Sequence, residues 1–589
     1  MKTEREIVEA VEKWRDDGAA SHHRFCRQAK DAQRFYDGDQ WDEADRRQLR
    51  EEGRPCLTIN LVRPQIDLIC GIQRQEKIDI KFIGRTADDA PIADAMTKLV
   101  KFVCDRNDFE MRQGDVFADG VLTGRGWFIV EQSFRDDWIH GEILVRREPP
   151  DEVIIPQGVD RDLSDCPWVL RIKQVPIAVA ERLWPKAKLK LTDPVDGSPS
   201  DEGTDYGRAS SATPMGTYEA TTRPPDTAEV IEAYWEEWVP VAVVTDTATG
   251  SVQVTEDMEA AKEAKRLVPT VDVIRRTRRR IRCARLSGST LLEGPVDVPG
   301  DRYPLVPFFC FRSPLAGDYG IVKNLLDPQR EVNKRRSQAL HIINTSANSG
   351  WISDDPELLE QLAQFGNRPG MTALKKPQSS YERIMPSVIP ASVVQMESLG
   401  RDDLKAISGI NSDLLGFREA TQSGVAIDLR MRQGMTIVAQ IFDQFRLALK
   451  EVARRVAARV IAYMPEEEIA RVLGEEGSPE IMAAVKRADV LRYDLVAAQS
   501  PSSPSVRMAN FLMLMEMRKA GIPIPDELIV EASDLPGKEK ILEKLAAPKP
   551  IPGTTPPGIP PSMPPLGPGG GAGAEFGRES TAPAPAPTF

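Results

Sequence analysis

Arginines dominate the residues that could do chemistry in this chain, and they are concentrated in one short run. Seven arginines lie between positions 275 and 285 of the 589-residue sequence. If the segment is a strand, alternate side chains share a face. One face then carries Arg276, Arg278, Arg280 and Arg282, and the other carries Arg275 and Arg279.

Two interpretations of this run stay open. A row of guanidinium groups can contact phosphates. The alternative is a subunit interface or a solvated hairpin in which the arginines pair with acidic neighbours such as Glu236 and Glu237. The alternative is favoured, because the run lies in a β-rich region rather than in a helix that could enter a nucleic-acid groove.

A second basic cluster, Lys334-Arg335-Arg336, lies in a segment with helical periodicity. It could face a polyanion or be an ordinary charged helix surface. Acidic clusters such as Asp42/Glu43/Asp45 and Glu466–Glu468 are typical of solvated helix faces and helix N-termini. His341 is isolated, and with only four histidines and seven scattered cysteines a zinc site is not expected.

Catalytic signatures are missing from the sequence. It has no GxxxxGK[ST] phosphate loop, no GxGxxG after a strand, no HExxH and no GxSxG. Neither the residues nor their spacing calls for a cofactor or a metal. A structural or assembly role is therefore favoured over an enzyme.

The elements that must position these residues are predicted from apolar periodicity. Both helices and strands are expected, which gives a mainly helical α+β class. Helices are predicted over 4–35, 42–52, 61–75, 93–121, 255–267, 357–365, 394–408, 435–464, 479–487 and 506–519. A mostly helical stretch is predicted over 320–348, with the helix proper starting near Asp327-Pro328. Strands are predicted over 78–83, 127–132, 143–145, 153–155, 230–244, 271–286, 303–311 and 491–496, with a small β region within 370–393.

Composition and charge point to a soluble chain with an acidic balance. The apolar share is 41% and the formal net charge is −12. A dedicated DNA-binding domain is usually basic, so this balance favours a protein that lets nucleic acid pass over one that grips it. No apolar run reaches the ~20 residues of a membrane span. The Gly/Ser/Thr-rich segment 193–227 is predicted to be a mobile loop, and the Pro/Gly-rich segment 547–589 a disordered tail.

Several motifs, in this order, resemble those of the portal (head-to-tail connector) proteins of tailed bacteriophages, most closely the large portals of short-tailed phages. An opening of the form F-x-x-G-x-Q-W, then G-R-P, then N, is carried by Gln40, Trp41, Arg54, Pro55 and Asn60. Further along, 318–337 resembles a second portal segment that includes Asp327, Pro328, Gln329 and Asn333. The loop 409–434 before the long helix and the segment 493–504 complete the resemblance, which covers roughly residues 30–545.

The resemblance implies a ring of about twelve identical subunits around a channel at one capsid vertex. By analogy, 1–227 is a wing-like region that ends in a flexible loop, and 228–312 is a β-rich clip. The analogy makes 313–349 a stem helix, 350–434 a wing β region with a channel loop, 435–546 a long helix with a crown, and 547–589 a tail.

The resemblance also implies the function and the partners. Double-stranded DNA would enter and leave through the channel. The terminase large subunit, the major capsid and scaffolding proteins and a tail adaptor or head-completion protein would dock on the ring. Assembly is expected in the host bacterial cytoplasm and the final place in the virion, with no membrane. Other head–tail structural proteins and nucleic-acid-processing enzymes are the alternatives.

Lys334, Arg335, Arg336, Lys405 and Arg418 are the candidates for cations that face the channel. For each one taken singly, a surface or interface charge is favoured over a DNA contact. Arg276, Arg278, Arg280 and Arg282 are the candidates for the clip or for a subunit interface.

Overall fold

A computed structural model gives the fold of this chain. It describes residues 3–75, 78–84, 89–135, 137–185, 227–246, 252–268, 270–347, 351–365, 376–377, 380–383, 391–409, 424–474, 478–486, 495–501, 504–521 and 523–532. The predicted mobile loop, the predicted tail and Arg418 lie almost wholly or wholly outside these residues.

The chain divides into two compact units, Met1–Val506 and Arg507–Phe589. Helices of the first unit are α1 (Glu4–Asp37), α2 (Glu43–Glu51), α3 (Val62–Gln75), α4 (Ala90–Arg106), α5 (Phe109–Thr123), α6 (Ile177–Leu183), α7 (Met258–Leu267), α8 (Val322–Ala347), α9 (Pro356–Phe365), α10 (Ala391–Ser408), α11 (Gly424–Tyr463), α12 (Glu466–Leu473) and α13 (Pro479–Val485). Its strands are β1 (Ile78–Gly84), β2 (Arg125–Ser133), β3 (Glu142–Glu148), β4 (Val153–Ile154), β5 (Trp168–Pro176), β6 (Thr227–Asp246), β7 (Val252–Thr255), β8 (Val271–Ser287), β9 (Thr290–Asp297), β10 (Leu305–Phe309), β11 (Phe311–Ser313), β12 (Gly317–Tyr319), β13 (Trp351–Ser353), β14 (Tyr381–Arg383) and β15 (Leu495–Pro501). The predicted α+β class is confirmed.

The second unit begins within α15 (Pro504–Lys519) and contains α16 (Asp526–Ala532). An ion pair of 2.6 Å between Arg518 and Asp526 joins the end of one helix to the start of the other. The predicted helix over 506–519 is confirmed.

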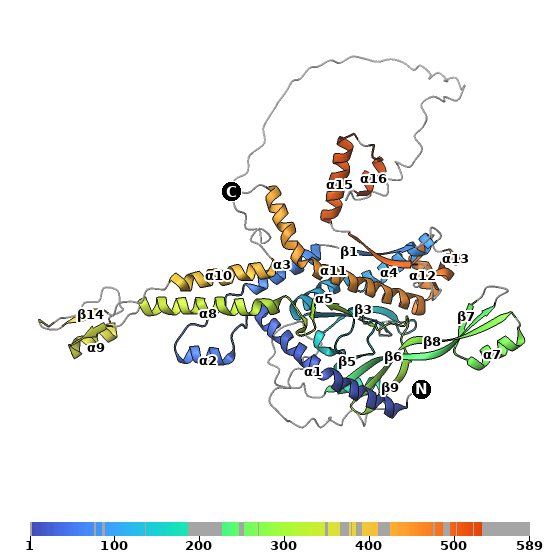
Figure 1. The fold of residues 1–589 in the computed structure, drawn as a ribbon, viewed down its shortest axis with the longest axis horizontal. Coiled ribbons are helices and arrows are strands. Elements are labelled where there is room, and N and C mark those ends of the chain that lie inside the picture. The colour runs from blue at the N-terminus through green and yellow to red at the C-terminus, as the bar shows by residue number, and fades with distance from the viewer. Residues whose placement is uncertain are drawn as a thin grey trace, which may run out of the picture. The chain divides into compact units, whose positions relative to one another are not determined.

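The largest sheet among the described residues is antiparallel, with the strand order β4-β5-β6-β8-β9 and β7 added beside β6. Figure 1 shows β6 and β8 as a long hairpin, with β7 and α7 at its far end. Helix α1 packs on the other part of this sheet, where Ile7 and Val11 join a buried cluster with Trp168 and Trp235. Thr3 forms a capping box with Glu6 at the start of α1, and Gly38, at a φ of 96°, ends it.

A three-stranded sheet with the order β10-β2-β3 lies in the main core, and α5 and α11 both pack against the same face of it. Phe117 of α5, Phe308 of β10 and Phe445 of α11 meet there, with ring centroids 5.0–5.6 Å apart. Gly120 makes this packing possible, since a Cβ at that position would lie 2.3 Å from the Phe308 ring. Strands that precede residue 227 therefore pair with strands that follow it in both sheets. The pairs are β2 with β10 and β5 with β6.

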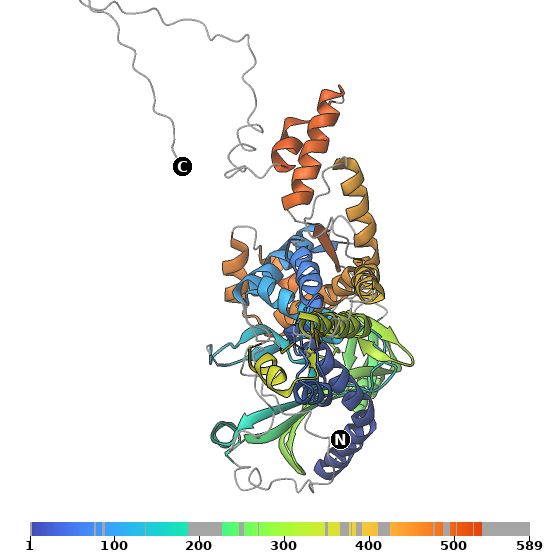
Figure 2. The same cartoon turned by 90° about the vertical axis from the view of Figure 1, so that its left-hand side faces the viewer.

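Helices α8 and α10 lie side by side, as Figures 1 and 2 both show. Helix α8 begins at Val322 and contains Pro328, so the prediction that it starts near Asp327-Pro328 is wrong. Proline is common in the first turn of a helix, so Pro328 suggests a helix start at that point. In the structure, buried Val322 and Leu325 belong to helical turns that precede it.

Two further predictions need correction. The helix predicted over 93–121 is two helices, because Asn107 ends α4 and Asp108, at a φ of 49°, starts α5. The long helix α11 begins at Gly424 rather than at 435, so part of the predicted loop 409–434 is helical. The remainder of that loop, 410–423, lies outside the described residues.

Candidate functional site

Five of the nine motif residues meet in one buried network of side-chain amides and an indole. Asn333 of α8 donates from Nδ2 to Oε1 of Gln40 over 2.7 Å. Gln40 in turn donates to Oδ1 of Asn60 over 3.1 Å and to the carbonyl oxygen of Phe35 over 2.8 Å. The turn after α1 is thereby fixed to the middle of α8, 293 positions away in the sequence.

One face of α8 holds the extended segment 57–61, which we call the clamped segment. Gln329, Asn333 and Ser337 are spaced four residues apart, so their side chains line up along the helix. Gln329 accepts from Leu61 N and donates to Ile59 O; Asn333 accepts from Ile59 N at 2.9 Å, and Ser337 accepts from Leu57 N at 3.0 Å. Trp41 closes the other side through its indole N–H, which donates to Leu57 O. These side chains replace the partner strand that the clamped segment lacks.

The other motif residues lie outside this network. Arg54 pairs with Glu52 at 3.0 Å, and Pro55 is half-buried in the chain that leads to the clamped segment. The exposed Asp327 pairs with Arg330, and Pro328 lies inside α8. Of the nine motif residues on which the resemblance rests, five therefore belong to one hydrogen-bonded network, and the other four lie outside it.

Each described channel candidate has a carboxylate partner. Lys334 lies 3.0 Å from Asp45, Arg335 lies 3.4 Å from Glu331, and Lys405 lies 3.4 Å from Asp402. Arg336 pairs at 2.9 Å with the mostly buried Glu397 of α10, which also binds Arg401. The basic cluster on α8 is therefore largely neutralised within the chain.

The arginine run forms β8, as predicted, and most of its arginines are paired. Arg279 binds Glu236 at 3.0 Å and Arg282 binds Glu237 at 2.6 Å, which are the two acidic neighbours that the sequence suggested. Arg278 binds Asp301, and Arg280 binds Glu256 and Asp297. Arg276 is exposed, and no acidic group of the described residues pairs with it. The pairing supports the solvated-hairpin alternative for most of the run.

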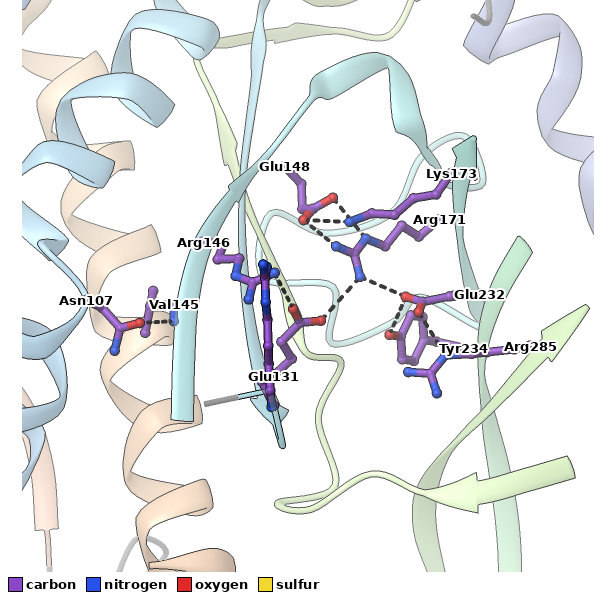
Figure 3. Close-up of polar contacts among 12 residues, drawn as sticks. Asn107, Glu131, Val145, Arg146, Glu148, Arg171, Lys173, Glu232, Tyr234 and Arg285 are labelled. Atoms are coloured by element: carbon purple, nitrogen blue, oxygen red, sulfur yellow. Dashed lines mark hydrogen bonds and ion pairs between the residues drawn. The ribbon is translucent and has the colours of Figure 1, made fainter. Parts of the chain in front are cut away.

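A buried ion network that the sequence did not indicate connects the two sheets. Figure 3 shows Arg171 of β5 between Glu148 of β3 and Glu232 of β6. Its side chain is only 2% exposed and binds Glu148 through two nitrogens, and Glu131 of β2 lies 3.4 Å away. Glu232 also accepts from Arg285 at 2.9 Å and from the Tyr234 hydroxyl at 3.2 Å.

The network determines the charge state of Glu232. Burial alone would raise its pKa, but Arg171 and Arg285 outweigh burial and lower the pKa to about 2. The carboxylate thus contributes stability above its ordinary pKa of about 4.5, and this contribution is lost as the pH falls from about 4.5 towards 2.

Glu152, at the end of a short turn beside β4, behaves in the opposite way. Burial, reinforced by the neighbouring Glu148, raises its pKa to about 8, although Lys173 and Arg171 oppose the shift. Oε2 of Glu152 is buried, with no hydrogen-bond partner among the described residues. Because the folded state holds the proton more tightly, stability decreases as the pH rises from about 4.5 to 8.

We expect the Glu152→Gln variant to be more stable than the wild type at pH 8 and to match it at pH 4. The amide cannot ionise, so the gain at pH 8 should be at least about 1.4 kcal/mol, the value of one pKa unit. Urea unfolding at both pH values measures the difference. A gain that is equal at pH 4 and pH 8 would show that ionisation of Glu152 is not its cause. Glu12→Gln on α1 serves as the exposed control.

The described residues contain no group of three or more His, Cys, Asp or Glu that could hold a metal ion. Burial raises the pKa of Cys70, Cys104 and Cys166 to about 12, so these thiols stay protonated at neutral pH. Within the same part of the chain, no helix is both long and apolar enough to cross a membrane.

Comparison with known proteins supports the resemblance seen in the sequence. The chain matches the family model described as "Phage P22-like portal protein" over residues 12–567. A search of curated proteins gives no match. The family match extends across both sheets, the α8 amide network and the long helix α11, and proteins of this family are structural rather than enzymatic. The chain therefore belongs to the P22-like family of phage portal proteins.

Proposed function

We propose that about twelve copies of this chain form a ring around a channel at one capsid vertex, through which double-stranded DNA is packaged and later ejected. The family match over residues 12–567 carries this proposal. The ring docks the terminase large subunit during packaging and a tail adaptor or head-completion protein afterwards. It assembles with the major capsid and scaffolding proteins in the host bacterial cytoplasm.

The proposed division into regions follows the portal plan. Residues 1–227 form the wing, 228–312 the clip, 313–349 the stem, and 350–434 a second wing region with the channel loop. Residues 435–546 form the long helix and crown, followed by the tail 547–589. In this plan α8 is the stem helix, and the β6–β8 hairpin reaches the clip.

The charge pairing on α8 and α10 supports the role of a conduit. Every phosphate that a protein neutralises adds to its affinity for DNA, so unpaired cations in a ring would hold the DNA in place. Lys334, Arg336 and Lys405 each have a carboxylate partner. The channel therefore carries positive groups close to DNA while keeping the net attraction low.

The mass and symmetry of the purified full chain test this proposal. Light scattering should give about twelve times the chain mass, and negative-stain images should show rings with a central hole. A monomer or dimer that hydrolyses ATP or cuts DNA would overturn the proposal.

We predict that Asp45→Asn increases the affinity of the ring for double-stranded DNA. The substitution frees Lys334, whose Nζ lies 3.0 Å from Oδ2 of Asp45. Each additional phosphate contact should make the salt dependence of binding steeper by about 0.9 in a plot of log K against log salt. DNA binding to purified rings at several salt concentrations measures this slope.

The matched control for this prediction is Glu259→Gln, which frees Lys262 on the surface of α7. This pair lies outside the proposed stem, so the slope of log K against log salt for Glu259→Gln rings should stay at the wild-type value. If Asp45→Asn also leaves the slope unchanged, Lys334 does not face the DNA.

A further inference from the structure

The short turn η2 (Pro150–Glu152) is a covalent connection between the two sheets. It follows β3, which belongs to the three-stranded sheet, and leads directly into β4, the edge strand of the larger sheet. Strand β4 has only two residues, Val153 and Ile154, which pair with Arg171 and Leu170 of β5. Because the connection is so short, any change in the turn reaches both sheets.

The last residue of the turn carries a buried carboxyl group. Glu152 is 8% exposed, and its Oε2 has no hydrogen-bond partner among the described residues. By contrast, the neighbouring Glu148 binds both Arg171 and Lys173, as Figure 3 shows. A buried polar group without a partner is costly, and a buried charge without a partner is far more costly. The closed turn therefore accommodates Glu152 only while its carboxyl group holds a proton.

The surroundings of Glu152 offer no cation that another carboxylate does not already bind. The charged and titratable groups around the turn are Glu148 and Arg147 of β3, Asp151 of the turn itself, Arg171 and Lys173 of β5, Glu131 of β2 and His22 of α1. Besides the two cations that Glu148 binds, Arg147 is paired with Asp119 at 2.7 Å. Burial lowers the pKa of His22 to about 4, so its ring is neutral at neutral pH.

The opening of the turn is linked to the release of this proton. In the closed turn the pKa of Glu152 is about 8, whereas its ordinary value, which the open turn restores, is about 4.5. Between these two values the closed turn holds a proton that the open turn releases. The ratio of open to closed turns therefore increases about tenfold for each pH unit. Above about pH 8 both forms are ionised, and the ratio levels off.

We propose that η2 is a proton-operated joint between the two sheets. Protonated Glu152 keeps the turn closed, and its ionisation opens the turn and frees the edge strand β4 from β5. The joint is stiff at acidic pH and loosens as the pH rises, so the three-stranded sheet gains freedom to move against the larger one. This joint belongs to the single subunit, so its failure would leave the proposed ring and channel untouched.

Amide hydrogen exchange of the full-length protein tests the joint, because it reports local opening segment by segment. Exchange is followed at pH 5, 6, 7 and 8, and each rate is divided by the intrinsic rate of the amide at that pH. The corrected rates of Glu152, Val153 and Ile154 should increase about tenfold for each pH unit, or about a thousandfold in total. The amides of α7, which is remote in the sequence and mostly exposed, should show no such increase.

A comparison with the main core separates local opening from global unfolding. Phe128 and Ile129 lie in the central strand β2 and are fully buried. At every pH the amides of Val153 and Ile154 should exchange faster than those of Phe128 and Ile129. Equal rates in both segments would mean that only global unfolding releases Glu152, and this outcome would overturn the inference.

Two variants complete the test. Glu152→Gln cannot ionise, so the corrected rates of its Val153 and Ile154 amides should not change with pH. Lys173→Met removes a cation that holds down the pKa of Glu152, so the rates should continue to rise above pH 8 before they level off. The Lys173 side chain is 27% exposed, which makes this second substitution the milder one for the fold. A pH dependence that persists in Glu152→Gln, or a levelling-off that does not move in Lys173→Met, contradicts the joint.

Discussion

Replacing Arg171 with methionine should lower the free energy of unfolding by about 3–5 kcal/mol. The guanidinium lies between Glu148 and Glu232, whose side chains are 3% and 12% exposed. Methionine has a similar volume but no charge, so it leaves two desolvated carboxylates without their main cation. Urea unfolding of the full-length protein, followed by tryptophan fluorescence, measures the loss.

Arg146→Met is the matched control for this experiment. Arg146 lies in the same region and also binds Glu131, but its side chain is 42% exposed. Exposed ion pairs contribute about 0–1 kcal/mol, so its loss should be small. A loss for Arg171→Met no greater than that for Arg146→Met would show that the buried network is not what holds the two sheets together.

A triple variant separates the cost of unpaired charge from the loss of the network. Adding Glu148→Gln and Glu232→Gln to Arg171→Met removes the two stranded carboxylates. The three most buried charges of the network are then removed together, and replacing a buried ion triad as a unit is often close to neutral, whereas removing one member is costly. We therefore expect the triple variant to recover most of the stability lost by the single one.

Local sequence signals predicted most of the helices and strands. The Thr3–Glu6 capping box and Gly38 delimit α1, and apolar periodicity located the β2–β3 hairpin. Boundaries failed where tertiary contacts decide them. The break between α4 and α5 has neither proline nor glycine; instead the Asn107 side chain binds the backbone of Val103 and of Ile143 in β3. No local pattern shows that contact.

The candidate site was predictable only in part, for the same reason. The basic residues of α8 are visible in the sequence, but the partner of Lys334 is Asp45, on α2. Glu236 and Glu237 could be suggested as partners because the two long predicted strands, 230–244 and 271–286, lie in the same β-rich region. The structure pairs these strands directly as β6 and β8. The Arg171 network draws its residues from five strands, so it has no local signature. A portal resemblance located the amide network but could not give its geometry.

Replacing Asn333 with alanine should lower the free energy of unfolding by about 3 kcal/mol, because it leaves several buried polar groups unpaired. The lost partners are Oε1 of Gln40, the backbone N–H of Ile59 and Nε2 of Gln329, at 2.7, 2.9 and 3.1 Å. Water cannot easily replace them, since Asn333 is 1% exposed and Gln329 is fully buried. Urea unfolding measures this loss as well.

Lys334→Ala is the control, since this neighbouring side chain is 59% exposed and its removal should cost at most about 1 kcal/mol. A double-mutant cycle with Gln40→Ala then isolates the contact between α8 and the turn after α1. The free energy of unfolding of the double variant should fall by clearly less than the sum of the two single losses. The reason is that either single substitution leaves the amide of the other residue without its hydrogen-bond partner. Additive losses would mean that the two amides stabilise the fold independently. The clamped segment would then be held by α8 alone, and the shared order of the motif residues would not reflect one cooperative network.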